Sequence, residues 1–245
     1  MSAAAPVGTG TPATRILGLL TLAGLVWVVL FGLVLSPPDA VQGESVRYLY
    51  LHVPAAWLAY LSFFVTALGS VLWLWKRTRN PGWDRLAGAS AEIGVFFTAL
   101  CLLTGSLWGR ETWGSYWTWD ARLTTTAMLL LLFIGYLALR RLPAPPDVRA
   151  RRCAIAGVIA FVDVPIVHKS VEWWRTLHQP STVKLGDAEI DGLMLFSLFV
   201  GVVAFTLLYV WLVIHRTRVA FLEDAVEAQE LDLLIAERIA ETEEV

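Results

Sequence analysis

Six long runs of apolar residues, separated by short polar segments, dominate the pattern along the chain. The first run, residues 16–35, is unbroken over 20 residues and is long enough to cross a bilayer at about 1.5 Å of rise per residue. Charged or proline-containing segments separate the later runs. The predicted spans are residues 16–35, 51–75, 88–107, 123–139, 150–167 and 193–214. The pattern therefore predicts an all-α polytopic membrane protein with six transmembrane helices.

The two ends of the chain differ from this membrane domain, predicted over residues 14–218. Residues 1–13 consist largely of Ala, Gly, Thr and Pro without periodicity, which predicts a disordered leader. Residues 219–245 carry nine acidic residues and one arginine, with an apolar stripe at helical spacing. The stripe comprises Phe221, Ala225, Ala228, Leu231, Ile235 and Ile239. This acidic helical tail either packs on a protein partner, or on itself, or is simply solvated.

Composition supports a membrane protein and argues against thiol chemistry. The chain is 57% hydrophobic and only 16% charged, whereas soluble domains carry about 25% charged residues. Its two cysteines, Cys101 and Cys153, lie in or beside apolar runs and form no CxxC pair. The absence of a CxxCH motif from the sequence indicates that the protein is not itself a c-type cytochrome.

The distribution of Lys and Arg predicts which side each loop faces. One set of alternate segments holds twelve of these residues and the other set holds six. Under the positive-inside rule, both termini are cytoplasmic. The twelve are Arg15, Lys76, Arg77, Arg79, Arg85, Arg140, Arg141, Arg149, Arg151, Arg152, Arg216 and Arg218. The segments around residues 36–50, 108–122 and 168–192 then lie on the outer face.

The segment of residues 108–120 is unusually aromatic for a loop. It contains four tryptophans and one tyrosine within thirteen residues: Trp108, Trp113, Tyr116, Trp117 and Trp119. Tryptophan concentrates at membrane interfaces, and Asp120 is suited to capping the next helix, so an aromatic belt with a helix cap is one interpretation. Because a single loop does not need four anchors, we favour a platform for a large planar ligand.

A second aromatic segment lies in the loop before the sixth span. Val167, Val171, Trp174 and His178 fall on one helical face, which predicts a short external amphipathic helix that ends at Pro180. This helix is expected to bring Trp173 and Trp174 beside the first aromatic segment.

The chain has only four histidines, and three of them are predicted to lie on the outer side. Two neutral imidazoles on opposite faces of a porphyrin iron form a six-coordinate site. His168 and His178 are ten residues apart, about 15 Å along one helix, so they are a poor pair. His52 with His178 is favoured, because Trp174 shares the face of His178. His168 is the reserve ligand, or a group that supports a ligand. His215 is assigned to anchoring at the interface.

Charged residues near these elements have two interpretations. Three arginines on the outer side are suited to pairing with porphyrin propionates, or they balance nearby carboxylates. The arginines are Arg110, Arg122 and Arg175, and the carboxylates are Glu111, Asp120 and Glu172. Asp163 lies within the fifth span, where an ionisable group is functional by default unless it reaches the hydrated surface.

Three motifs carry a resemblance to a known family. Residues 113–120, WGSYWTWD, match the WGxxWxWD signature of the haem-handling WWD proteins of cytochrome c biogenesis. Residues 50–56 and 171–179 look like the segments around that signature in the CcmC family of haem exporter proteins. The resemblance covers about residues 15–215. It does not cover the leader or the acidic tail, and Asp163 is not part of the family pattern.

The resemblance implies a haem-binding protein of the bacterial inner membrane that holds haem b transiently at its outer face. It implies His52 and His178 as axial ligands, and the chaperone CcmE, the transporter subunits CcmA and CcmB and the small protein CcmD as partners in an ABC-type complex. The remaining expected site residues are Trp108, Trp113, Trp117, Trp119, Asp120, Arg122, Trp173 and Trp174.

Catalysis by the protein itself is not expected, because holding and passing on a cofactor requires no bond-making side chain. Two alternatives remain. A cytochrome c synthetase (haem lyase) of the same superfamily generally has more spans or a large extra domain, for which this chain has no room. A haem-translocating permease needs a polar or small-residue lining along its spans, and these spans are nearly featureless.

Overall fold

The computed structural model describes residues 9–178, 183–184, 187–188 and 192–243. Its long helices are α1 (Pro12–Trp27), α2 (Leu49–Leu74), α3 (Pro81–Trp113), α4 (Ala121–Arg141), α5 (Pro146–Phe161), α6 (Asp163–Trp173) and α7 (Gly192–Glu243). A π-helical segment, η1 (Val28–Leu35), continues α1, and a 3-10 turn, η2 (Glu44–Tyr48), leads into α2. Two short antiparallel strands, β1 (Val183–Lys184) and β2 (Asp187–Ala188), lie between α6 and α7.

The prediction of six transmembrane helices is confirmed. Six segments in the described part of the chain are long and apolar enough to cross a membrane. Each contains one of the predicted spans almost completely, and most extend beyond it. They are Pro12–Leu35, Glu44–Leu74, Pro81–Trp113, Ala121–Arg141, Pro146–Trp173 and Gly192–Ala240. The helices are longer than the apolar runs because a helix can continue past the hydrocarbon core, where its polar residues meet water or headgroups.

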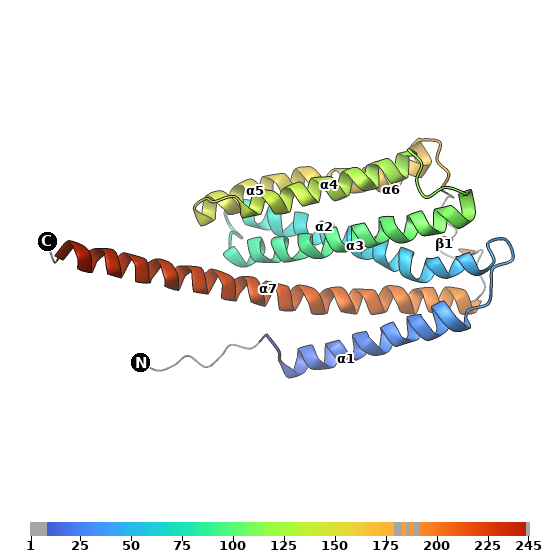
Figure 1. Cartoon of the computed structure of the whole chain (residues 1–245), viewed down its shortest axis with the longest axis horizontal. Coiled ribbons are helices and arrows are strands. Elements are labelled where there is room, and N and C mark those ends of the chain that lie inside the picture. Colours follow the sequence, from blue (N-terminus) through green and yellow to red (C-terminus); the bar gives the residue numbers. More distant parts are fainter. Residues whose placement is uncertain (1–8, 179–182, 185–186, 189–191, 244–245) are drawn as a thin grey trace.

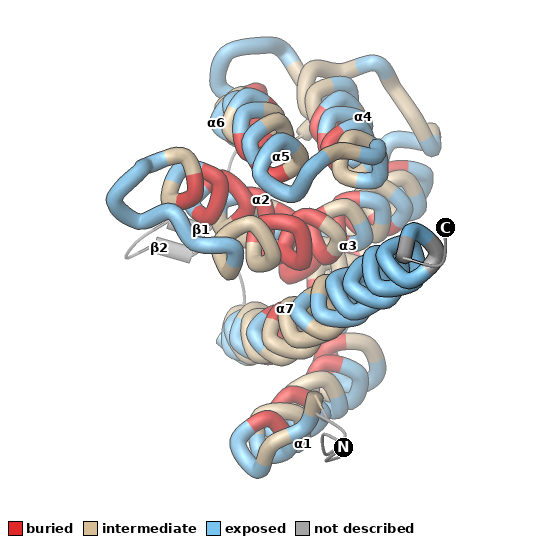
Figure 2. Tube along the Cα trace, turned by 90° about the vertical axis from the view of Figure 1, so that its left-hand side faces the viewer, coloured by how far each residue is buried: buried red, intermediate tan, exposed pale blue. Residues whose placement is uncertain are grey.

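Helices α2 and α3 form the centre of the bundle. Helix α2 packs against α3, α5 and α7, and α3 also contacts α4 and α7. Helices α4, α5 and α6 cover one side of this pair, while α7 with α1 covers the other (Figure 1). The end-on view shows that buried positions concentrate on α2 and α3, whereas α1 and much of α7 are exposed (Figure 2). Exposed apolar residues on the outer helices are expected where lipid is the solvent.

Close contacts hold α4 against the central α2–α3 pair. The rings of Phe63 on α2 and Phe133 on α4 stack with centroids 3.7 Å apart. Gly94 on α3 admits this packing, because a Cβ there would lie 2.5 Å from the Phe63 ring. Near the opposite end of α4, Arg140 forms a two-pronged ion pair with Asp84 at 2.7 and 2.9 Å. These contacts hold α4 against the α2–α3 pair. They therefore also fix the position of the first turn of α4, which follows the aromatic segment.

The start of α1 and the end of α7 lie at the same end of the bundle, and α7 projects beyond it (Figure 1). The connections that follow η1, α3 and α6 lie at the opposite end (Figure 1). This is the end that carries the two aromatic segments of the sequence, and below it is called the aromatic end. An even number of spans requires this arrangement, in agreement with the predicted placement of both termini on one side.

The aromatic loop is shorter than the sequence pattern indicates. Helix α3 runs on to Trp113 and ends at Gly114, whose φ of 75° is left-handed. Gly114 donates its N–H to the Arg110 carbonyl at 3.1 Å, and glycine adopts this cap conformation without steric cost. Trp108 and Trp113 are therefore helical residues, and only residues 114–120 form the connection. Hydropathy marks where the apolar segment ends, not where the helix ends.

The prediction that an external helix extends to His178 is wrong. Helix α6 ends at Trp173 and Trp174 is extended, with φ −129° and ψ 159°. The backbone amides of Leu177 and His178 bond to the Asp120 carboxylate and to the Thr176 hydroxyl instead of helix carbonyls. Tertiary hydrogen bonds thus replace another helical turn. The expected stop at Pro180 lies outside the described residues.

The two ends of the chain also differ from the expected boundaries. Thr11 caps α1, which begins at Pro12 within the expected leader, and residues 1–8 lie outside the described residues. The sixth span and the acidic tail form one continuous helix, α7. Arg85 on α3 and Arg149 on α5 pair with Asp224 at 2.7 and 3.6 Å, so the first two turns of the tail are attached to the bundle.

Candidate functional site

His52 lies in the first turn of α2 at the aromatic end. Its Nδ1 is 3.1 Å from the Thr104 hydroxyl on α3, and its ring meets that of Trp108 edge-on, with centroids 5.7 Å apart. The Trp108 indole N–H is bonded to Gln42 in the preceding loop at 2.9 Å. His52 is half-buried. Its ring orientation is determined by Thr104 and Trp108 of α3, and Trp108 is in turn held by the first outer loop.

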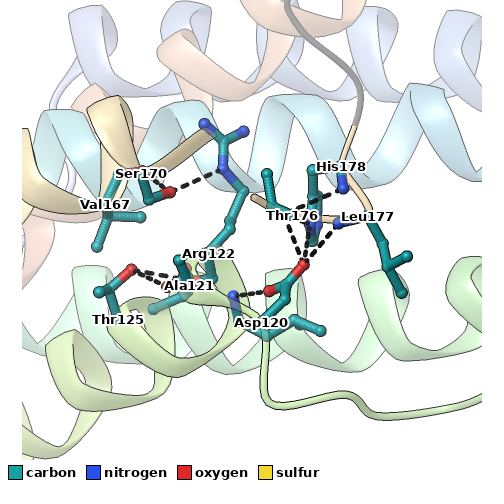
Figure 3. A network of polar contacts seen from close by, with 11 residues as sticks. Asp120, Ala121, Arg122, Thr125, Val167, Ser170, Thr176, Leu177 and His178 are labelled. Carbon is teal, nitrogen blue, oxygen red and sulfur yellow. Dashed lines mark hydrogen bonds and ion pairs between the residues drawn. The ribbon is translucent and has the colours of Figure 1, made fainter. Parts of the chain in front are cut away.

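Asp120 connects the start of α4 with the segment after α6. Its Oδ1 accepts the Leu123 N–H at 2.8 Å and caps α4, as expected for an N-cap aspartate. Its Oδ2 accepts the Thr176 hydroxyl at 2.6 Å and lies 3.0 Å from Nδ1 of His178. Figure 3 shows these bonds converging on one carboxylate. Asp120 can therefore cap α4 through Oδ1 and orient His178 through Oδ2, so its two expected roles are compatible.

The electrostatics of this pair describe a hydrogen bond of neutral imidazole rather than an ion pair. Burial lowers the pKa of His178 from its usual value, although the bond to Asp120 acts in the opposite direction. Burial alone would raise the pKa of Asp120, but the bonds from Thr176, Leu123 and His178 together hold it below its usual value. A carboxylate only accepts hydrogen bonds, so Nδ1 of His178 carries the hydrogen. Nε2 is left with a lone pair that suits a metal ion.

The last turns of α3 bring the two histidines to the same end of the bundle. Trp108 contacts His52, and Trp113 contacts His178 with ring centroids 4.8 Å apart. The two tryptophans are five residues apart on one helix, or about 7.5 Å along its axis. Residues more than a hundred positions apart in sequence thus lie at the same end of the bundle. His178 is placed by Trp113 and Asp120, not by a helical face shared with Trp174.

The remaining tryptophans do not form one continuous plane. The rings of Trp117 and Trp119 are nearly perpendicular, at 83°, as are those of Trp173 and Trp174, at 74°. Trp119 is 81% exposed and Trp174 is 50% exposed. Trp117 is half-buried, and its Nε1 has no hydrogen-bond partner among the described residues. A flat ligand would therefore face single rings, and the buried Trp117 Nε1 does not reach its surface.

The arginines at this end bond chiefly to backbone and hydroxyl oxygens. Arg122 donates to the His168 carbonyl at 3.1 Å and lies 3.5 Å from the Ser170 hydroxyl, which ties α4 to α6. Arg110 donates to the Gly114 carbonyl at 2.5 Å and lies over the Tyr116 ring. Arg175 is exposed. In the described structure, Arg110 and Arg122 thus stabilise helix ends through hydrogen bonds. Neither pairing with propionates nor balancing of carboxylates, the two expected roles, includes this one.

His168 lies deeper along the bundle than His52. Its ring contacts Tyr60, which follows His52 by eight residues in α2, about 12 Å along the axis. His215 contacts Trp211 on α7, far from this site along the chain. Asp163 is buried, and its carboxylate oxygens have no hydrogen-bond partner among the described residues. Only 3% of Asp163 is exposed, so the hydrated position that the sequence left open for it is not observed.

Three residues of this site were missed by the sequence reasoning. Thr104 and Gln42 contact His52 and Trp108, and Thr176 bonds to Asp120. Thr104 is one turn before Trp108 on the same face of α3. A side chain that packs on Trp108 is therefore also close to Thr104. Gln42 and Thr176 lie in irregular segments, whose contacts have no periodic signal in the sequence.

Comparison with known proteins points to one family. The family model described as "Heme exporter protein C" matches residues 4–232. "Heme exporter protein C" of Bradyrhizobium diazoefficiens is 40% identical over 225 residues, which cover 90% of this chain and 83% of the relative. The protein of the same name from Escherichia coli K12 is 40% identical over 195 residues, covering 78% and 76%. A "Putative cytochrome c biosynthesis ccmC-like mitochondrial protein" of Arabidopsis thaliana is 35% identical, covering 78% and 73%.

Proposed function

Because this chain belongs to the haem exporter protein C family, we propose that it holds haem at the aromatic end of its helix bundle and delivers it to the haem chaperone CcmE. A role in haem handling during cytochrome c maturation follows from the family. The proposal adds the location of the site, its ligands and the recipient.

The observation that supports the proposal most is the pair of half-buried imidazoles at the end of α3. Haem iron needs only two ligands from the protein, because the porphyrin supplies the other four. His178 carries its hydrogen on Nδ1, toward Asp120 at 3.0 Å, and keeps Nε2 free. A carboxylate behind a ligating histidine fixes the ring and raises its basicity. His52 lies beside Trp108 on the same helix that contacts His178 through Trp113.

The surrounding side chains are suited to a ligand that must leave again. Exposed indole rings offer apolar contact without enclosing the ligand; they belong to Trp113, Trp119, Trp173 and Trp174. The exposed Arg175 is available to a propionate. These residues bind and orient haem, and no side chain is required to make or break a covalent bond.

The charge distribution supports an outer location for this site. The segments at the end with the chain termini hold most of the Lys and Arg residues, so that end faces the cytoplasm under the positive-inside rule. The aromatic end then faces outward from the bacterial inner membrane. In this arrangement CcmE approaches the exposed rings, while CcmA, CcmB and CcmD are partners in an ABC-type complex.

The proposal is tested by purifying the protein from cells that make haem and recording its visible spectrum. His52→Ala and His178→Ala are expected to lower the haem retained per protein and to convert a six-coordinate spectrum to a five-coordinate one. His168→Ala and His215→Ala are the matched controls and should retain the original spectrum. If His168→Ala alone loses haem, the ligand pair is wrong, and if the unmodified protein never retains haem, the function is wrong.

Delivery is tested separately with purified CcmE. Haem-loaded protein is mixed with haem-free CcmE, and transfer is followed by the change in absorbance. Trp119→Ala removes the most exposed ring of the site and is expected to slow transfer several-fold while haem stays bound to the donor. Trp75→Ala, an exposed tryptophan at the other end of α2, serves as the control. Equal transfer by both variants would contradict a role for the exposed rings in delivery.

A further inference from the structure

We propose that Thr104 is the positioning residue of His52: its hydroxyl accepts the Nδ1 hydrogen and leaves Nε2 free for iron. This inference rests on the proposed function, because it assigns a role within the same haem site. It goes beyond that function by naming a residue, outside the aromatic motifs, that determines whether His52 can act as a ligand.

Thr104 is placed for this role by the periodicity of α3. Cys101, Thr104 and Trp108 recur at spacings of three and four, so they share one helical face. All three contact the His52 ring: the Thr104 hydroxyl at 3.1 Å from Nδ1, Cys101 through its sulfur, and Trp108 edge-on. Thr104 is only 4% exposed, so water does not compete for its hydroxyl.

The direction of the hydrogen bond follows from counting hydrogens. The Thr104 hydroxyl lies 2.8 Å from the Leu100 carbonyl and 3.2 Å from the Cys101 carbonyl, and both of these oxygens only accept. A hydroxyl has one hydrogen and two lone pairs. Its hydrogen is directed to the helix carbonyls, so a lone pair faces His52. Nδ1 is then the donor, and Nε2 carries the lone pair.

The thiol of Cys101 does not compete for this assignment. Its sulfur lies 3.8 Å from Nδ1 and 4.0 Å from Nε2 of His52. Since the two distances are nearly equal, the sulfur lies beside the ring rather than in line with either nitrogen. A thiol is also a weak partner compared with a hydroxyl. Thr104 is therefore a stronger partner of Nδ1 than the Cys101 thiol.

The two proposed ligands are consequently supported in unequal ways. His178 is backed by a carboxylate at 3.0 Å and His52 by a neutral hydroxyl at 3.1 Å. Hydrogen bonds to ionised acceptors are roughly twice as strong as neutral ones. His52 is thus the weaker donor to iron, and its ligation is the more sensitive to losing its supporting group.

The experiment compares three substitutions on α3 in the full-length protein. Thr104→Val keeps the volume and removes the hydroxyl, whereas Thr104→Ser keeps the hydroxyl. Thr98→Val is the matched control, because Thr98 is similarly buried on the same helix and, among the described residues, its hydroxyl bonds only to the Gly94 carbonyl. Each variant is purified with haem, and its visible spectrum, spin state and haem dissociation constant are measured.

Thr104→Val is expected to weaken haem binding about 10–100-fold, the usual effect of losing a group behind a metal ligand, and to raise the high-spin fraction. Thr104→Ser and Thr98→Val should retain the original spectrum. If Thr104→Val keeps the original affinity and spectrum while His52→Ala loses them, the positioning role is wrong and the haem site stands. If Thr98→Val fails like Thr104→Val, the effect is general helix damage and the inference is overturned. If His52→Ala itself changes nothing, the proposed ligand pair fails instead.

Discussion

Oδ2 of Asp120 lies 3.0 Å from Nδ1 of His178, although the two residues are 58 positions apart in the chain. The other oxygen of the same carboxylate caps α4. One side chain therefore sets where a transmembrane helix begins and how a proposed haem ligand is oriented. A change at this position affects both roles unless the substituted side chain can keep one of them.

Asp120→Asn separates these roles. Asparagine caps helices about as well as aspartate, so the amide oxygen can keep the bond to Leu123. Its NH₂ group then faces His178 and cannot accept the Nδ1 hydrogen. We expect an unchanged thermal unfolding midpoint and about 10–100-fold weaker haem binding. The measurements are haem titration and thermal unfolding in detergent. Loss of stability with intact haem binding would show that only the cap matters.

Gly105→Ala is expected to displace His52. A Cβ at this position would lie 2.8 Å from Cε1 of the His52 ring, which is too close for an unshifted ring. Alanine favours a helix by about 1 kcal/mol over glycine, so the fold should persist while haem ligation changes. The visible spectrum and the haem dissociation constant report the effect. Gly135→Ala, on α4 with open space around its Cβ position, is the control and should leave both unchanged.

Gly114→Ala is expected to destabilise the end of α3. Gly114 has a φ of 75°, and a left-handed backbone costs an alanine about 1–2 kcal/mol. The thermal unfolding midpoint in detergent should fall, and the contact of Trp113 with His178 should loosen, as seen in haem retention. The same Gly135→Ala control should instead stabilise α4 slightly, because that glycine lies inside a helix. Equal shifts in both variants would contradict the cap assignment.

Truncation of the acidic tail should show where its structural role ends. Ion pairs attach Asp224 and Glu227 to Arg85 of α3 and Arg149 of α5, whereas every described residue from Ala225 to Ala240 is exposed. A chain ending at Ala228 should therefore keep its thermal midpoint. A chain ending at Arg218 loses these pairs, each worth about 0.2–1 kcal/mol at the surface, and should unfold at a lower temperature. Destabilisation by the shorter deletion would reveal contacts beyond Ala228.

The sequence by itself determined the membrane architecture. Apolar runs of sufficient length predict six spans, and the structure has six segments that fit. The aromatic motif and the histidine-containing segments on its two sides also predict the family, which is confirmed over residues 4–232. These predictions succeed because hydrophobic length and local motifs are properties of contiguous residues.

Only the tertiary structure decided how those segments meet. The sequence pattern extended a helix to His178, but Asp120 and Thr176 capture the amides that this helix would have used. The pattern of α3 places Thr104 on the same face as Trp108, but it does not indicate that the Thr104 hydroxyl meets His52, 52 positions earlier in the chain. Such contacts depend on helix packing and on single hydrogen bonds between distant segments, which leave no periodic trace. The sequence therefore identifies the candidate ligands, while the fold determines which atoms hold them in place.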